Sequence, residues 1–173
     1  MITVRREISQ DIPQIHELNT KAFGQPTEAK IVDRLRKRCP DILSLVAVDN
    51  RSIVGHLLFS PVIIEDAGAK SVGMGLAPMA VLPGHQRQGI GSILVRKGLQ
   101  LLGDRGCPYV IVLGHPEFYP RFGFEPASKY GIACQWPGVP DEAFMVLELM
   151  HNALANTKGT ARYRDEFNEA MRG

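Results

Sequence analysis

Cysteine is scarce in this 173-residue sequence, and its three cysteines follow no metal-binding or disulfide pattern. Cys39, Cys107 and Cys134 lie far apart and form no CxxC motif and no Cys/His cluster. The sequence therefore supports neither a disulfide framework nor a zinc site. Reduced thiols are typical of cytosolic proteins, so we expect a cytoplasmic location and no bound metal.

The sequence also lacks an excess of one charge and a long apolar run. Lys and Arg number 20 against 18 Asp and Glu, which gives a formal net charge of +2. A protein that neutralises a nucleic-acid backbone needs basic patches and an extreme pI, so no nucleic-acid partner is expected. The most apolar stretch, Leu57 to Ile64, is interrupted by Ser60 and Pro61 and is far shorter than the ~18 residues of a membrane span. The N-terminus has no signal-peptide layout, and no membrane partner is expected.

The remaining composition is that of a folded chain. Hydrophobic residues make up 45% and charged residues 22%, which excludes a disordered chain. No repeat or long linker occurs, so one domain over residues 1–173 is predicted. Its core covers about residues 2–150, and residues 151–173 form a more polar C-terminal extension.

Hydrophobic periodicity predicts the order β-α-α-β-β-β-α-β-α-β, an α+β arrangement with a mostly antiparallel meander and one long crossover helix. Strands are predicted at Ile2–Ile8, Leu43–Val48, Ile53–Ile64, Ser71–Leu82, Tyr109–Leu113 and Phe144–Leu149, with a short one near Thr160–Tyr163. Helices are predicted at about residues 11–23, 27–39 and 89–102, with a short turn around 117–122 and a short helix near 165–171.

Three local predictions accompany these elements. Thr27 is expected to cap the second helix, which Pro40 ends. The basic run Arg34–Arg38 is expected to form a solvated helix face. Asp49-Asn50-Arg51 is expected to form a turn, because these residue types tolerate positive φ.

The segment from Met79 to Ser92 carries the most chemical information. An apolar strand runs into a polar loop, which opens a helix with Gly89 and Gly91 at its first turn. The first N–H groups of a helix lack internal partners and carry partial positive charge, so this loop suits phosphate binding through backbone amides, with Arg87 nearby. The alternative is a tight strand-to-helix turn. No Walker lysine follows, and a dinucleotide fingerprint would need a third glycine near Leu94.

Two motifs resemble the GNAT superfamily of acyl-CoA-dependent N-acetyltransferases. Gln86-x-x-Gly89-x-Gly91 is similar to its Q/R-x-x-G-x-G/A signature, and Tyr119-Pro120-Arg121-Phe122-Gly123-Phe124 is similar to its Y-x-x-x-G-F segment. Further segments resemble a bacterial branch often called YhbS-like: Gly55–Pro61, Leu76–Val81, Gly114–Pro116 and Gly159–Tyr163. The resemblance implies an α/β sandwich whose mixed, mostly antiparallel sheet is splayed between strands 4 and 5, with helices on both faces.

The resemblance also implies a cofactor and the residues that hold it. In the family, the pantetheine arm of coenzyme A enters the gap between those two strands, and Pro78 suits such an interrupted ladder. Backbone groups of Met79, Ala80 and Val81 would bind the arm. The pyrophosphate would be held by the amides of Arg87, Gln88, Gly89, Ile90, Gly91 and Ser92. Acetyl-CoA is therefore the expected acyl donor.

By the same resemblance, an amine attacks the thioester directly, which requires a proton for the leaving thiolate. Tyr119 matches the family's general acid, and a phenol with a pKa of ~10 keeps its proton at neutral pH. The alternative is that Tyr119 only packs against neighbouring phenylalanines. The predicted strands carry no carboxylate base, which leaves His56, His115 and Glu117 as candidates.

The function implied is transfer of an acetyl group from acetyl-CoA to an amine of a small molecule, peptide or protein. The alternative is a coenzyme A-binding sensor or partner-binding module without catalysis, which the missing carboxylate base keeps open. A phosphate-binding structural protein without coenzyme A is a third hypothesis, which the Tyr119 segment disfavours. A homodimer is compatible with all three.

Overall fold

The computed structural model describes the backbone of residues 1–172 and the side chains of residues 1–170; Gly173, the last residue of the predicted extension, lies outside them. The chain divides into two units. Among the described residues, the first comprises 1–60, 77–100 and 165–172, and the second comprises Pro61–Leu76 and Leu101–Arg164. Two long strands and one helix contribute residues to both units, and each unit is described by itself below.

The first unit contains four strands and four helices, some of which continue into the second. The strands are β1 (Ile2–Arg6), β2 (Leu43–Asp49), β3 (Ser52–Asp66) and β4 (Ala69–Val81), and the helices are α1 (Ile12–Phe23), α2 (Thr27–Arg38), α3 (Ile90–Asp104) and α4 (Asp165–Arg172). Two 3-10 turns, η1 (Ser9–Asp11) and η2 (Pro83–His85), complete it. The strand order is β1-β2-β3-β4, and the β1–β2 and β2–β3 pairs are antiparallel.

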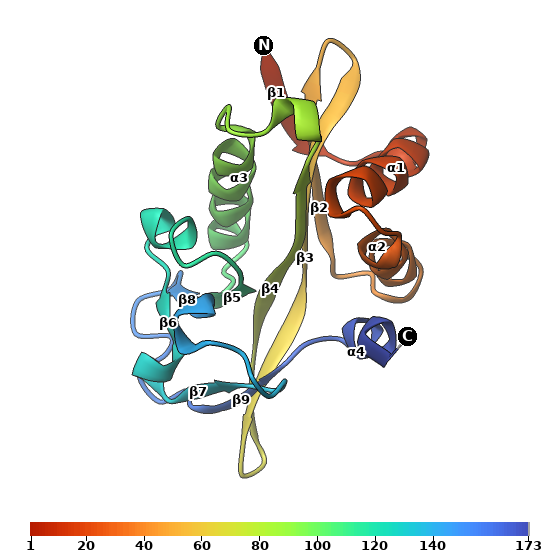
Figure 1. Cartoon of the computed structure of the whole chain (residues 1–173). Helices are drawn as coiled ribbons and strands as arrows, with labels where there is room; N and C mark the ends of the chain where they lie inside the picture. Colours follow the sequence, from red (N-terminus) through yellow and green to blue (C-terminus); the bar gives the residue numbers. More distant parts are fainter. Residues whose placement is uncertain (173) are drawn as a thin grey trace. The chain divides into compact units, whose positions relative to one another are not determined.

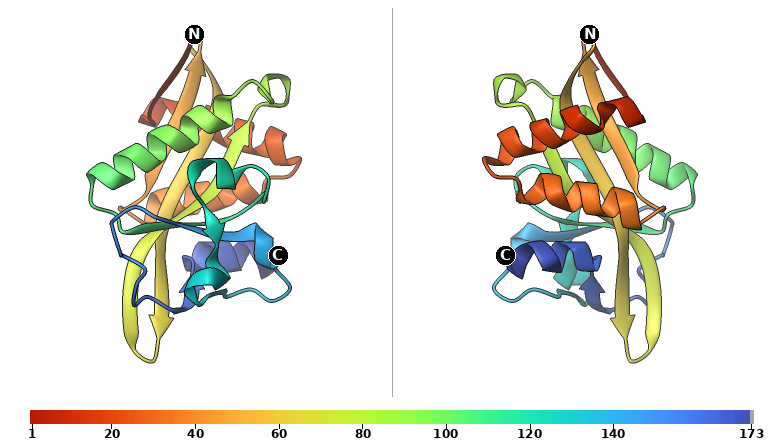
Figure 2. Two further views of the ribbon diagram at one scale, coloured as in Figure 1. Left: turned by 90° about the vertical axis from the view of Figure 1, so that its left-hand side faces the viewer. Right: turned by 90° about the vertical axis from the view of Figure 1, so that its right-hand side faces the viewer.

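Helices cover both faces of the strands in this unit. Helix α3 lies on one face and helices α1 and α2 on the other (Figure 1), and the two side views look onto α3 and onto the α1–α2 pair in turn (Figure 2). Helix α3 packs very closely on β3, because a Cβ added to Gly98 would lie 2.4 Å from the Phe59 ring and one added to Gly55 would lie 2.9 Å from Ile90. These glycines let the helix approach the strand.

The second unit is built on the remaining parts of β3 and β4. Its other strands are β5 (Tyr109–Leu113), β6 (Glu125–Pro126), β7 (Ile132–Cys134), β8 (Phe144–Glu148) and β9 (Gly159–Arg162), and its 3-10 turns are η3 (Tyr119–Phe122), η4 (Ala127–Tyr130) and η5 (Asp141–Ala143). The strand order is β4-β5-β8-β6, while β9 pairs with β3 and β7. Residues 109–112 of β5 are fully buried, as the continuous apolar run predicts.

The predicted fold class is confirmed. The sheet is mixed and mostly antiparallel, and β4 and β5 form a parallel pair over Met74–Leu76 and Val110–Val112. Helix α3 is the crossover that a parallel pair requires. The ladder between β4 and β5 ends at Leu76, and β4 continues through Pro78 to Val81.

Most predicted elements are confirmed, and the exceptions have physical reasons. The turn at Asn50 and Arg51 has positive φ at both residues, as expected. The prediction for Thr27 is wrong, because Pro26 occupies the N-cap and no side chain caps the helix. The solvated face is wrong at Arg36, whose side chain is only 17% exposed and forms ion pairs with Glu7 and Asp33.

The described part of the chain has neither a membrane-spanning helix nor a metal-binding cluster. None of its helices combines the length and apolar character needed to cross a bilayer. It also holds no group of three or more His, Cys, Asp or Glu side chains placed to bind a metal ion.

Candidate functional site

The first candidate region is the loop of the first unit that joins β4 to α3. The Leu82 N–H donates to the carbonyl of Val54 at 2.9 Å, which holds the start of the loop against β3. The Gln86 Nε2 donates to the carbonyl of Val81 at 3.1 Å, so the first residue of the signature folds back onto the end of the strand. This glutamine therefore shapes the loop rather than leaving its amide open.

The loop turns into the helix through two residues of left-handed conformation. Arg87 has φ of 62° and Gly89 has φ of 83°. A Cβ built on Gly89 would meet nothing within 4 Å, so the space beside this backbone is open. The first intrahelical bond runs from the Ile93 N–H to the Gly89 carbonyl at 3.1 Å, and the preceding amides are left for other acceptors. Such a helix start attracts an anion.

The predicted cofactor-binding residues fall on this loop and on the strand before it. Arg87, Gln88 and Gly89 are exposed. Ile90 is only 2% exposed, since its side chain packs in the core, and so only its backbone is available to a ligand. The other predicted residues continue along β4 and α3: Met79, Ala80, Val81, Gly91 and Ser92.

The second candidate region is the turn of the second unit that follows β5. The Gly114 N–H donates to the carbonyl of Ala143 at 2.9 Å, directly after the β5–β8 ladder ends. The His115 carbonyl accepts from the Phe118 N–H at 3.1 Å and from the Tyr119 N–H at 3.4 Å. These bonds fix the backbone that carries Tyr119.

The Tyr119 ring is buried, with 5% of the residue exposed. It meets the ring of Phe118 edge-on at 5.0 Å and that of Phe124 at 5.7 Å, so the predicted packing against phenylalanines is present. No hydrogen bond found among the described residues involves its hydroxyl. Burial raises the pKa of Tyr119 to about 12, so the phenol holds its proton even more firmly than a free tyrosine.

His115 and Glu117 lie in this same turn, and both are exposed. The chain therefore brings two of the predicted base candidates within four residues of Tyr119 in the sequence. Both side chains are open to solvent and to small solutes. The sequence places Gly114 in a family-like segment but does not predict its contact with the Tyr119 ring, because a contact between a glycine and a ring five residues later leaves no sequence signal.

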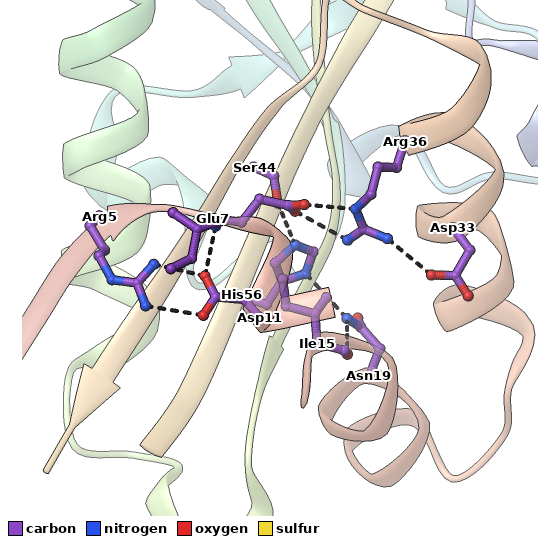
Figure 3. A network of polar contacts seen from close by, with 10 residues as sticks. Arg5, Glu7, Asp11, Ile15, Asn19, Asp33, Arg36, Ser44 and His56 are labelled. Carbon is purple, nitrogen blue, oxygen red and sulfur yellow. Dashed lines mark hydrogen bonds and ion pairs between the residues drawn. The ribbon is translucent and has the colours of Figure 1, made fainter. Parts of the chain in front are cut away.

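His56, the third base candidate, lies on β3 in the first unit and is completely buried (Figure 3). The Asn19 Nδ2 lies 3.1 Å from His56 Nδ1, and the Ser44 Oγ lies 2.9 Å from His56 Nε2. Burial, assisted by the positive charge of Arg36, lowers the pKa of His56 to about 4, although Glu7 opposes the shift. Both ring nitrogens are engaged and the ring is neutral at pH 7, so neither nitrogen is open to a ligand.

The hydrogen bonds around His56 have one consistent direction. Asn19 donates to Nδ1, so the ring proton sits on Nε2 and is donated to Ser44 Oγ. The Ser44 hydroxyl then donates to Glu7, which also accepts two bonds from Arg36 at 2.7 and 3.1 Å. This network joins Glu7, directly after β1, to β2, β3, α1 and α2, an arrangement typical of a structural network.

Comparisons with known sequences point to one family. A family model described as an acetyltransferase (GNAT) domain matches residues 3–127. The chain is 39% identical over 166 residues to the uncharacterized N-acetyltransferase YhbS of Escherichia coli (strain K12), which covers 95% of this chain and 98% of that protein. It is 38% identical over 135 residues to the uncharacterized N-acetyltransferase YjhQ of the same strain, with 76% and 74% covered.

Solved structures agree with this picture. The crystal structure of Escherichia coli YhbS in complex with CoA matches with a TM-score of 0.90 and 38% identity, over 96% of this chain and 92% of that one. A GNAT family acetyltransferase from Brucella melitensis in complex with acetyl-CoA matches with a TM-score of 0.79 and 32% identity, over 96% and 98% of the two chains.

Proposed function

This chain belongs to the GNAT acetyltransferase family, and from that membership we propose that it transfers an acetyl group from acetyl-CoA to an amine acceptor by direct attack of the amine on the thioester. The observation that carries the proposal is the geometry of the loop between β4 and α3. Its open backbone at Gly89 and its helix-start amides suit a diphosphate ligand. Relatives with this fold hold CoA and acetyl-CoA.

The donor set of the loop fits the coenzyme. The amides of residues 87–92 would bind the pyrophosphate, and Arg87, which is exposed, would add charge. Gly89 leaves room for an oxygen to approach the backbone because no side chain stands there. The backbone of Met79, Ala80 and Val81 at the end of β4 would hold the pantetheine arm and place the thioester.

Tyr119 would supply the proton that the leaving thiolate needs. The phenol is protonated throughout the neutral range because burial raises its pKa, and its oxygen has no competing partner within the described residues. A protonated hydroxyl without a competing partner can donate to a leaving group that comes within hydrogen-bond reach. His115 and Glu117 remain the proposed candidates for taking the proton of the amine, directly or through water. His56 is not part of the proposal, because its ring nitrogens are engaged in the interior.

Several finer features are part of the same proposal. The acceptor would be the amine of a small molecule, a peptide or a protein. We further propose a single domain over residues 1–173, a cytoplasmic location and no need for a metal. A homodimer remains a prediction, as does the absence of nucleic-acid and membrane partners.

A second candidate function is a coenzyme A-binding module without catalysis. It is favoured by one observation: β4 and β5 carry no carboxylate, and the buried histidine of β3 is engaged by Asn19 and Ser44. Such a module would use the same loop for binding and would leave Tyr119 as a packing residue.

Two measurements separate these functions. Calorimetry with acetyl-CoA should show binding, and no binding at millimolar ligand would contradict both candidates. A thiol-release assay across a panel of amines and peptides should then show acceleration by at least one acceptor. Binding combined with a slow background hydrolysis that no acceptor accelerates would favour the binding module.

A further inference from the structure

Gly114 lies directly against the ring of Tyr119. A Cβ built on Gly114 would stand 2.4 Å from Tyr119 Cε2, 3.1 Å from Cδ2 and 3.4 Å from Cζ. Carbon atoms in van der Waals contact are about 3.5–4.0 Å apart. Any side chain at position 114 therefore forces either the backbone or the ring to move.

The backbone at this point is held on both sides. Leu113 is the last residue of β5 to pair with β8, opposite Phe144. The Gly114 N–H is bonded to Ala143, and the next carbonyl, that of His115, accepts from two amides of the turn. Moving the Gly114 backbone would strain these bonds, so the ring is the part that yields.

The Tyr119 ring cannot move away from position 114 without also moving its hydroxyl group. Phe118 and Phe124 meet it edge-on, and Phe124 is itself only 2% exposed. Relieving a 2.4 Å contact requires a displacement of roughly 1 Å. The phenol oxygen moves with the ring, because the ring is rigid.

We propose that Gly114 is a positioning residue for Tyr119: the missing side chain at position 114 sets the place from which the hydroxyl delivers its proton. This inference rests on the proposed function, which gives Tyr119 the role of acid. Gly114 itself touches neither cofactor nor acceptor in this account, and it acts through the ring.

The direct test is Gly114→Ala, alone and combined with Tyr119→Phe. We expect kcat to fall about 10- to 100-fold in the single variant, as misplacement by about 1 Å can cost ~100-fold, while the Kd for acetyl-CoA stays unchanged. In the Tyr119→Phe background the alanine should add less than about 3-fold, because the proton donor is already gone. Full activity of Gly114→Ala would overturn the proposal, and so would an equal further loss in the double variant.

The chain offers a matched control in the same unit. A Cβ on Gly73 would stand 2.4 Å from Cε2 of Tyr109, the same distance as in the Gly114 pair. Gly73→Ala should lower the melting temperature and leave kcat per folded molecule unchanged, since Tyr109 has no catalytic role here. An equal loss of kcat in both alanine variants would mean general packing damage and would contradict a positioning role.

A second cycle needs no activity and keeps the contact testable if Gly114→Ala folds poorly. Tyr119→Leu removes the ring atoms nearest to position 114, so the drop in melting temperature caused by Gly114→Ala should shrink by at least half in that background. An undiminished drop would contradict the contact. If the wild-type chain transfers no acetyl group to any acceptor, the proposed function fails, whereas this cycle still decides whether Gly114 positions the ring.

Discussion

Tyr109 and Tyr119 lie in the same unit and are buried to nearly the same degree, with 0% and 5% of their surfaces exposed. Burial raises the pKa of each to about 12. Each ring also lies against a glycine, Gly73 or Gly114, where a Cβ would come within 2.4 Å. By exposure, pKa and packing, the two side chains are nearly indistinguishable.

Their hydroxyl groups differ. The Tyr109 hydroxyl donates to the carbonyl of Ser71 at 2.6 Å and lies 3.4 Å from the carbonyl oxygen of Val62. It therefore links the ring to both β4 and β3. None of the hydrogen bonds of the described residues engages the Tyr119 hydroxyl. A raised pKa alone therefore does not mark a functional tyrosine, and the two residues differ in whether the hydroxyl bonds to another described residue.

The largest expected effect comes from removing each hydroxyl in turn. Tyr119→Phe should lower kcat about 100-fold or more, because general acid catalysis contributes about 10²–10⁴-fold, with no change in acetyl-CoA affinity. Tyr109→Phe should keep kcat and lose about 1–3 kcal/mol of unfolding free energy, because a buried carbonyl loses its donor. Steady-state kinetics and urea unfolding on both variants check this pair. A loss of kcat in Tyr109→Phe together with an unchanged kcat in Tyr119→Phe would contradict the assigned roles.

The next largest effect is expected from a substitution in the loop between β4 and α3. It should change the affinity for acetyl-CoA, whereas Tyr119→Phe should change kcat. Gly89→Leu should weaken acetyl-CoA binding about 10-fold or more, because a side chain fills the open space and is strained at φ of 83°. Gly103→Leu, near the other end of α3, is the control and should leave the Kd unchanged, since a Cβ there also meets nothing. Calorimetry provides both values. An unchanged Kd for Gly89→Leu would refute the loop assignment.

A third buried group, His56, should behave as Tyr109 does, with an effect on stability only. Its pKa of about 4 lies below the ordinary 6.5, so the unfolded chain takes up a proton first as the pH falls. Stability should therefore decrease from pH 6.5 towards pH 4 and lose about 2 kcal/mol between pH 7 and pH 5. His56→Gln should flatten this dependence in urea unfolding, and the exposed His115→Gln should not. Equal slopes in the wild type and His56→Gln would contradict the buried neutral ring.

The last prediction is that the kcat of the wild type does not change with pH because of Tyr119. Because burial raises the pKa of Tyr119 to about 12, its acid form persists well above pH 10. The kcat of the wild type should show no decline that Tyr119 causes between pH 8 and pH 10. A pH–rate profile that falls in this range in the wild type, and not in the residual activity of Tyr119→Phe, would mean that the hydroxyl titrates normally.

The helices, strand β5 and the two motif segments could be predicted because their signals lie within short stretches of sequence. Amphipathic periodicity located α1, α2 and α3, and the apolar run located β5, because these signals lie within each element. The two motifs located the loop and the tyrosine turn for the same reason. Strands β6 and β7, of two and three residues, are too short to show a period.

Contacts between distant residues account for what the sequence could not predict. The partners of His56 are Ser44, 12 residues away, and Asn19, 37 residues away, and no motif links them. Without these partners, His56 reads as an ionisable residue near the predicted site. The fold instead places it in the interior and engages both ring nitrogens, which favours a structural role over that of a base.

We propose that this chain moves an acetyl group from acetyl-CoA to an amine and uses the hydroxyl of Tyr119 as the proton donor. The most direct test of this proposal is incubation of the wild type, Tyr119→Phe and Tyr109→Phe with isotope-labelled acetyl-CoA and a panel of amines, followed by mass spectrometry of the products. The account predicts labelled acetyl-amine from the wild type and Tyr109→Phe, and strongly reduced label from Tyr119→Phe. Tight binding of acetyl-CoA with no labelled amine from any of the three proteins would contradict it.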